Sequence, residues 1–279
     1  ITALGIVFGI YGAEAIRDAM MMNEGEGVNR GVLQIILIAS SLGVFLFPAI
    51  LLPITEGRKL YGFYGFRQPD LKLLGLVLLM MIVSMPVMEW TASINQKMTL
   101  PEALKPIEKW MKEKEDGTME TTLLLLTMSN VKELLMNIFM IALLPAIAEE
   151  LMFRGGVQRT FSGMFNNPHL AIWTAAFIFS AIHLQFYGFL PRLLLGAGFG
   201  YIYYFSGNLW YAMLGHFLNN AYAVCAAWYM QKNNIPLSAT DSTIDIAWYG
   251  YLISFILTVI VFIYFKSTTK QKLYERRMD

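Results

Sequence analysis

The chain has 279 residues, of which 56% are hydrophobic and 15% charged, and its net charge is +1. Soluble domains carry roughly 25% charged residues, so this composition excludes an ordinary soluble protein. The near-zero net charge gives no reason to expect a nucleic-acid partner. The single cysteine, Cys225, excludes an internal disulfide framework and a multi-cysteine metal site, and we interpret it as a small apolar helix residue.

Several apolar runs are long enough to cross a lipid bilayer, which requires about 20 residues of helix. The first 22 residues form the weakest candidate, because Glu14, Arg17 and Asp18 interrupt the run and are costly in lipid. The clearer runs cover residues 32–54, 72–92, 133–148 continuing into 149–162, 170–187, 190–205, 209–230 and 247–265. We therefore predict an all-α, polytopic transmembrane bundle with seven to eight spans and the lipid bilayer as its surroundings.

Polar segments separate these runs. Residues 55–71 and the tail 266–279 are basic, and the positive-inside rule places both in the cytoplasm. Residues 95–131 are predicted to form an amphipathic helix after Pro101, either a solvated connector at the membrane surface or a gate that recruits substrate. The chain then divides into N-terminal helices with this connector (1–130), a core (131–230), and a last helix with the basic tail (231–279).

The first polar cluster interrupts the apolar run that ends at Ile147. Ionisable groups inside membrane helices are expensive, so such positions are where function is expected. Arg154 follows Glu150 by four residues, the spacing at which opposite charges meet on one helix face. We predict that Arg154 holds Glu150, while Glu149, about 100° round the helix, faces a different surface. A carboxylate without a cation partner in an apolar site is a candidate general base.

Two further clusters lie in the following apolar runs. His183 stands near the end of one of them, and His216 and Asn220 share a helix face in another. His169 follows Pro168 in a turn and is interpreted as a surface or cap residue.

The hairpin geometry brings the first two clusters to one height. Taking Asn166 and Asn167 as the tip, Glu149 and His183 each lie about 17 residues away, roughly 25 Å along antiparallel helices. Each cluster alone is compatible with a solvated helix end, a satisfied interface histidine or interhelical hydrogen bonding. Their combination at matched height favours one shared site.

The three motifs together resemble a known family. Glu-Glu-x-x-x-Arg at 149–154, Phe-x-x-x-His at 179–183 and His-x-x-x-Asn at 216–220 are similar to those of the CPBP intramembrane proteases, which include type II CAAX prenyl endopeptidases and bacterial Abi proteins. The resemblance covers about residues 130–230 and implies an all-helical membrane fold, a cavity around these side chains and endopeptidase activity. It also implies a peptide or protein substrate, prenylated in eukaryotic relatives, and a bacterial inner membrane as the location.

For this chain the resemblance leads to a hypothesis about the roles of the motif residues. Glu149 takes the proton of the attacking water and later passes it on, while His183 holds that water. His216 and Asn220, one helical turn apart, donate to the oxyanion of the tetrahedral intermediate. Glu150, with Arg154, forms an electrostatic brace that keeps Glu149 in position.

Whether this family uses a metal is disputed, so two versions of the cofactor expectation stay open. In one there is no cofactor. In the other, Glu149, His183 and His216 supply three ligands to Zn²⁺ and leave the fourth position to water. Against the metal version, the chain lacks the His-Glu-x-x-His pair that places two ligands on one helical turn.

Two other classes of function compete with the protease hypothesis. A transporter or proton-coupled channel also uses intramembrane Glu, His and Arg, but the halves of this chain show no inverted repeat. A non-catalytic immunity or scaffold protein would not require all five polar groups of the motifs. The sequence leaves open which membrane face the site opens to.

Overall fold

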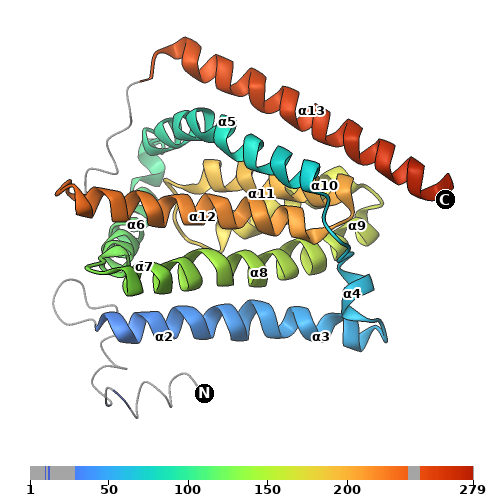
Figure 1. Ribbon diagram of the computed structural model, residues 1–279. Coiled ribbons are helices and arrows are strands. Elements are labelled where there is room, and N and C mark those ends of the chain that lie inside the picture. The colour runs from blue at the N-terminus through green and yellow to red at the C-terminus, as the bar shows by residue number, and fades with distance from the viewer. Residues whose placement is uncertain (1–9, 11, 13–28, 238–245, 279) are drawn as a thin grey trace.

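The computed structural model of the chain describes residues 10, 12, 29–237 and 246–278. Within these ranges every regular element is a helix and no strand occurs (Figure 1), which confirms the all-α prediction. The weakest predicted span, in the first 22 residues, lies outside the continuous described ranges.

The N-terminal part forms one long rod followed by a turn and a second long helix. The rod consists of α2 (Arg30–Ser40), a π-helical turn η1 (Ser41–Leu46) and α3 (Phe47–Thr55), and Asn29 caps it by accepting a hydrogen bond from the Gly31 amide. The short α4 (Leu60–Phe63) leads to α5 (Leu71–Gln96), whose N-cap Asp70 accepts from the Leu73 amide. The elements η2 (Glu102–Leu104) and α6 (Lys105–Leu126) follow, so the predicted helical connector is confirmed.

The middle of the chain forms a second rod, which carries the first motif. It consists of α7 (Val131–Asn137), the π-helix η3 (Ile138–Leu143), α8 (Leu144–Glu150), the π-helix η4 (Leu151–Gln158) and α9 (Arg159–Phe165). The α8 helix, which ends with the two glutamates, therefore lies between two π-helical segments. Such segments widen the turn locally and are frequent at functional sites.

A tight hairpin and three further helices complete the described part of the chain. Asn166 adopts the left-handed conformation with φ 50°, and the side chain of Asn167 caps α10 (Pro168–Ala181) by accepting from the His169 and Leu170 amides. This confirms the predicted hairpin tip. His169 is exposed and its Nδ1 lies 3.0 Å from the Tyr201 hydroxyl, as expected for a residue at the surface. The remaining helices are α11 (Phe189–Ser206), α12 (Leu209–Lys232) and α13 (Trp248–Met278).

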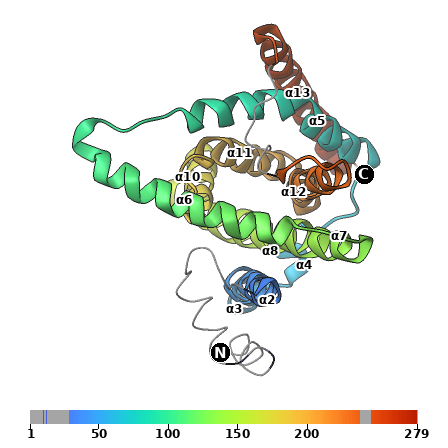
Figure 2. The same ribbon diagram turned by 90° about the vertical axis from the view of Figure 1, so that its left-hand side faces the viewer.

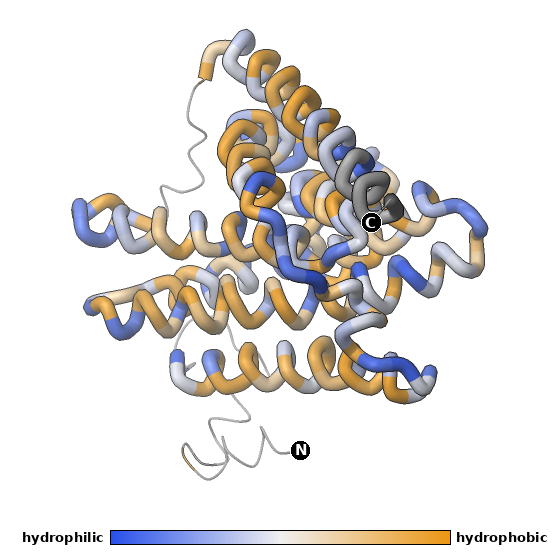
Figure 3. Tube along the Cα trace, turned by 45° about the vertical axis from the view of Figure 1, so that its right-hand side comes forward, coloured by the Kyte–Doolittle hydropathy of each residue, from blue (hydrophilic) through white to orange (hydrophobic). Residues whose placement is uncertain are grey.

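The helices pack around α12. It contacts η3 and α8 on one side and α5 and α11 on the other, while α13 covers α5 (Figures 1 and 2). The long rods lie side by side, and α3 and α13 carry many hydrophobic residues (Figure 3). Exposed apolar side chains on these helices include Phe47, Ile54, Phe255 and Ile263. Exposed apolar surface of this extent marks a protein whose surroundings are lipid. The chain is an integral membrane protein.

Fewer helices qualify as spans than predicted. In the described part of the chain four are long and apolar enough: Arg30–Thr55, Leu71–Gln96, Val131–Phe165 and Trp248–Lys270. The prediction of seven to eight spans is not confirmed. At 14 residues, α10 is roughly 21 Å long, which is too short for a hydrocarbon core about 30 Å thick. Polar residues, Arg192 in α11 and the third motif in α12, lower the hydropathy of the other two helices.

Candidate active site

A buried network of three charged or polar side chains joins the first and third motifs. The Nε atom of Arg154 lies 3.0 Å from Oε2 of Glu150, and both side chains are at most 1% exposed. The predicted Glu150–Arg154 ion pair is therefore confirmed. The other carboxylate oxygen, Oε1, lies 2.9 Å from Nδ1 of His216. Because a carboxylate only accepts hydrogen bonds, Nδ1 carries the proton, and Nε2 of His216 is the atom left for the site.

Glu149 faces this second nitrogen. Its Oε2 lies 3.8 Å from Nε2 of His216, so the two adjacent glutamates flank one imidazole ring, each on a different nitrogen. The expectation that Glu149 turns to a separate surface fails in this respect, because carboxylates 100° apart on a helix can still reach opposite edges of one ring. At 3.8 Å the two atoms are too far apart for a direct hydrogen bond. A water hydrogen-bonded to both would be held at this position.

Two phenylalanines fix the orientation of this network. The Phe199 ring stacks on His216 with centroids 5.7 Å apart, and Phe179 meets His216 edge-on at 5.9 Å. The Arg154 guanidinium lies 5.1 Å and 5.9 Å from the centroids of Phe179 and Phe199. These cation–π contacts help to keep a buried guanidinium in place. Since Phe179 is the first residue of the second motif, all three motifs meet at this ring.

His183 lies just beyond the end of α10, at the edge of this network. Its Nδ1 is 2.6 Å from the backbone carbonyl oxygen of Phe179, so Nδ1 is the protonated nitrogen and Nε2 is left as an acceptor. Leu184, with φ 53°, turns the chain directly after it. No hydrogen bond or ion pair between His183 and Glu149 is present in the described residues. The matched height predicted for the two side chains brings them to one region without direct contact.

Asn220 is tied to the rod that carries the glutamates. Its side-chain amide donates to the backbone oxygen of Ile141 at 3.1 Å, and its Oδ1 accepts from Asn219 at 3.2 Å. Ile141 belongs to η3, where the wider π-helical turn leaves carbonyl groups accessible. An amide nitrogen has two hydrogens, so Asn220 retains one for another acceptor.

The side chains proposed as zinc ligands do not form a ligand set in this geometry. In the described ranges, no group of three or more His, Cys, Asp or Glu side chains is close enough to hold a metal ion. Glu149 and His216 approach each other, and His183 packs on the Phe179 ring, with centroids 5.0 Å apart, while the same ring also contacts His216.

Comparison with known proteins identifies the segment that contains these motifs. Residues 131–222 match the family described as type II CAAX prenyl endopeptidase Rce1-like. The segment that carries all three motifs is therefore similar to this family. A relative described as uncharacterized protein YpbD of Bacillus subtilis (strain 168) is 32% identical over 93 residues, which are 32% of this chain and 44% of that protein. The chain thus spans less than half the length of this relative. No solved structure matches the chain.

The loop after His183 connects the Rce1-like segment to the N-terminal helices. The side chain of Asn95, in α5, donates to the Phe186 oxygen at 3.0 Å and accepts from the Leu190 amide at 2.6 Å. Glu115, in α6, accepts from the Tyr187 amide at 3.2 Å. The Trp110 ring packs against Phe186 with centroids 5.4 Å apart. Burial raises the pKa of the Glu115 carboxyl, although its backbone hydrogen bonds act in the opposite direction.

Arg192 is a charged residue of this region that the sequence analysis missed. It lies in the first turn of α11 and donates to both the side-chain and the backbone oxygen of Gln185. Glu149 and Glu115 are its charged neighbours, although neither carboxylate lies within 4 Å of its guanidinium among the described residues. The rule that singled out the motif glutamates also applies to Arg192, an isolated cation in an apolar run.

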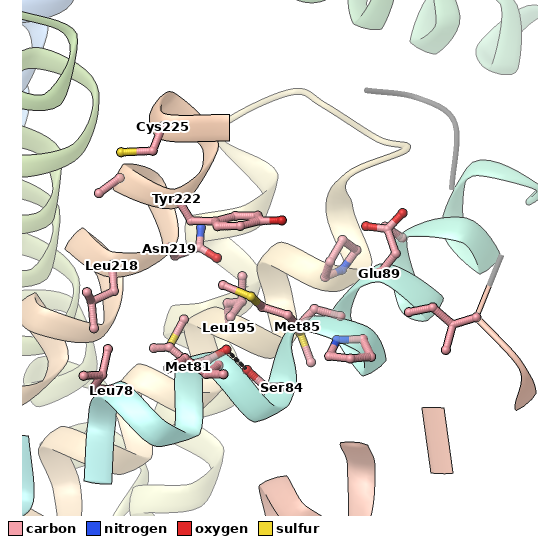
Figure 4. Close-up of a pocket in the computed structure, with 17 residues that line it drawn as sticks. Leu78, Met81, Ser84, Met85, Glu89, Leu195, Leu218, Asn219, Tyr222 and Cys225 are labelled. Carbon is pink, nitrogen blue, oxygen red and sulfur yellow. Dashed lines mark hydrogen bonds between the residues drawn. The ribbon is translucent and has the colours of Figure 1, made fainter. Parts of the chain in front are cut away.

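An apolar groove of about 610 Å³ opens between α5, the start of α11 and α12 (Figure 4). Met81 and Met85 line it from α5, and Asn219, Tyr222 and the exposed Cys225 line it from α12. Asn219 also bonds to Asn220, so the wall of the groove is directly connected to the third motif. Methionines adapt to ligands of different shape, because their side chains are flexible and polarisable.

Proposed function

We propose that this chain is an intramembrane endopeptidase. It hydrolyses a peptide bond of a membrane-associated or prenylated CAAX-type substrate with water activated by a glutamate. The strongest support is the pair of carboxylates on the two nitrogens of His216, which lies inside the Rce1-like segment. The imidazole lies between the carboxylate of Glu150, which is paired with Arg154, and that of Glu149, which has no Lys or Arg within 4 Å among the described residues. The ring therefore has one fixed side and one reactive side.

In this mechanism Glu149 is the general base. A water bonded to its Oε2 loses a proton to the carboxylate and attacks the scissile carbonyl carbon, and the resulting carboxylic acid then donates that proton to the leaving amine. His183 helps to hold the water, because its Nδ1 hydrogen is used on Phe179 and its Nε2 accepts. The Glu149 carboxyl group thus takes up one proton and releases the same proton within one turnover.

The oxyanion of the tetrahedral intermediate needs donors. With Glu150 on its Nδ1, His216 presents Nε2 to the oxyanion and donates from that nitrogen when it carries a proton. The remaining amide hydrogen of Asn220, one turn further along α12, supplies the second. A preorganised donor of this type is usually worth about 3 kcal/mol. Arg154 compensates the buried charge of Glu150 and so acts as a positioning residue.

The groove and α6 supply the route for substrate. The groove volume falls in the range of about 300–1,000 Å³ typical of ligand sites, and its apolar wall suits a lipidated or hydrophobic chain. Through Trp110 and Glu115, α6 contacts the loop that follows His183, so movement of α6 would shift that loop. This favours the gate interpretation of the amphipathic connector over that of a passive surface segment.

The test is cleavage of a prenylated CAAX-type peptide, alongside a peptide library, by the purified chain in detergent. Glu149→Gln removes the base without changing the shape of the side chain, and Glu102→Gln is the matched control at an exposed carboxylate of η2. We expect the first variant to lose at least 100-fold in kcat and the control to retain wild-type turnover. A chelator arm on both proteins measures metal dependence. Equal turnover by wild type and Glu149→Gln would contradict the proposal and favour a transporter, to be tested by proteoliposome flux.

A further inference from the structure

A second cavity of about 380 Å³ lies near the C-terminal end of the rod that carries the two glutamates. It is enclosed by η4, α9, the start of α10 and the turn from α11 to α12. It shares only Arg154 with the network around His216. The other polar side chains that line it are Gln158, Arg159, Ser162, Tyr203 and Tyr204. The cavity thus approaches the guanidinium that compensates Glu150, and most of the residues that line it carry a polar group.

Two residues that line this cavity, Arg154 and Gln158, carry buried polar atoms without partners in the described part of the chain. Nη1 and Nη2 of Arg154, which is 1% exposed, have no hydrogen-bond partner in the described part of the chain. The same holds for Oε1 of Gln158, which is 7% exposed and whose amide nitrogen donates to the Gly200 oxygen. Buried polar groups are nearly always satisfied, so such atoms call for a ligand or water that completes them. Here they call for an acceptor on the arginine and a donor on the glutamine.

The rim of the cavity is basic. Arg159 lies over the Phe63 ring at 3.8 Å and donates to the Phe63 oxygen, yet one third of its side chain is exposed. The surrounding end of the molecule carries Arg58, Lys59, Arg67, Lys266 and Lys270, against the acidic Glu56 and Asp70. Glu56 lies 3.7 Å from both Arg58 and Arg159 and offsets part of this charge.

These basic residues lie together because the chain segments that carry them pack at one end of the bundle. The side chain of Asn208 donates to the Arg67 oxygen, and Lys266 lies 4.8 Å from the Phe205 ring. In Figure 1, α4, α9 and the C-terminal part of α13 lie on this side of the bundle. Helix ends of membrane proteins lie at the headgroup level, where clustered Lys and Arg attract anionic lipid.

We propose that this cavity binds a phosphate group that bears a neighbouring hydroxyl, the chemistry of a phosphatidylglycerol headgroup. The phosphate oxygens accept from Arg154 and Arg159, and the hydroxyl donates to Oε1 of Gln158. Arginine suits this role because its planar group binds phosphate oxygens in pairs. A phosphatidylcholine headgroup has no hydroxyl for Gln158 and would bring its own positive charge to Arg159. A bound phosphate would hold the Arg154 guanidinium in place, and Arg154 in turn holds the Glu150 carboxylate that contacts His216.

The test measures binding, so it does not depend on whether the chain is a protease. The purified full chain is titrated with short-chain phosphatidylglycerol, short-chain phosphatidylcholine and sn-glycerol 3-phosphate, and bound ligand is counted by native mass spectrometry. We expect saturable phosphatidylglycerol binding at least tenfold tighter than that of phosphatidylcholine. Arg159→Gln should weaken it at least tenfold, whereas Lys112→Gln, on the exposed face of α6, should not change it.

Three results would overturn the proposal. They are equal affinity for the two lipids, unchanged phosphatidylglycerol binding by Arg159→Gln, and equal weakening by Arg159→Gln and Lys112→Gln. Arg159→Lys, which keeps the charge, and a thermal unfolding curve for each variant separate lost binding from lost folding. Gln158→Leu should reduce the preference for phosphatidylglycerol over a phosphatidic acid of equal chain length. Binding of sn-glycerol 3-phosphate as tight as that of the lipid would support the phosphate chemistry but replace the membrane by a soluble ligand.

Discussion

The side chain of Asn220 donates to the backbone oxygen of Ile141, which joins α12 to the π-helix that precedes the two glutamates. The third motif is therefore part of the candidate oxyanion site, and it also joins α12 to the rod that carries the two glutamates. In the same region His216 receives one glutamate on each ring nitrogen. Substitutions at these positions separate chemistry from structure only when activity and unfolding are measured on the same variants.

Asn220→Ala is expected to lower kcat about 10²-fold, because it removes an oxyanion donor. It also removes the bond to Ile141, at a cost of about 1–3 kcal/mol in unfolding free energy for the unpaired carbonyl. Cleavage rate and thermal unfolding of the same preparation are the measurements. Asn233→Ala, at the exposed C-terminal end of the same helix, is the control and should lose less than tenfold. A rise in KM with kcat unchanged would assign Asn220 to substrate binding instead.

Glu150→Gln is expected to destabilise the fold by about 3–5 kcal/mol, because it leaves the Arg154 guanidinium buried without a countercharge. The double variant Glu150→Gln with Arg154→Met removes both charges and should recover most of this loss. Activity should not return with it, since Nδ1 of His216 still lacks a carboxylate. Unfolding in detergent and peptide cleavage are measured for both variants. Recovery of activity in the double variant would mean that the pair serves stability only.

The pH dependence of stability is expected to report on Glu115. Burial raises the pKa of its carboxyl above the usual 4.5, so between 4.5 and the raised value the folded chain holds a proton that the unfolded chain has released. The contribution of this group is full below 4.5 and is lost as the pH rises through the folded pKa. Glu115→Gln, whose side-chain oxygen can still accept from Tyr187, should remove that slope. Parallel Tm curves for wild type and variant across this range would contradict it.

Local spacing in the sequence predicted the features that depend on local structure. The four-residue step from Glu150 to Arg154 gives an ion pair in the structure, because helical neighbours meet at that spacing. Asn166 and Asn167 form the hairpin tip, since asparagine tolerates the left-handed conformation and caps helices well. The residues after Pro101 form α6, as the helical spacing of their apolar side chains predicted.

Features that depend on packing between helices were not predictable in this way. The contact of both glutamates with His216 depends on the π-helical turns around α8, and a π-helix has no clear sequence signal. The contact of α6 with the loop after His183 joins segments 72 residues apart at Glu115 and Tyr187. The prediction of seven to eight spans is not confirmed, because α10 to α12 are apolar enough in sequence to resemble spans but are not among the four described helices that are long and apolar enough.

Gly155 tests the packing of the rod that carries the active-site residues. A Cβ atom at this position would collide with the ring of Tyr64, which is fully buried and whose hydroxyl donates to the Ala49 oxygen. Gly155→Ala should therefore cost about 1–3 kcal/mol by overpacking, although alanine is the better helix former. Gly163→Ala, further along the same rod with open space around its Cβ, is the matched control and should be neutral or stabilising. Adding Tyr64→Leu to Gly155→Ala removes the collision, so a double variant less stable than the sum of the two single effects would show that another contact requires glycine here.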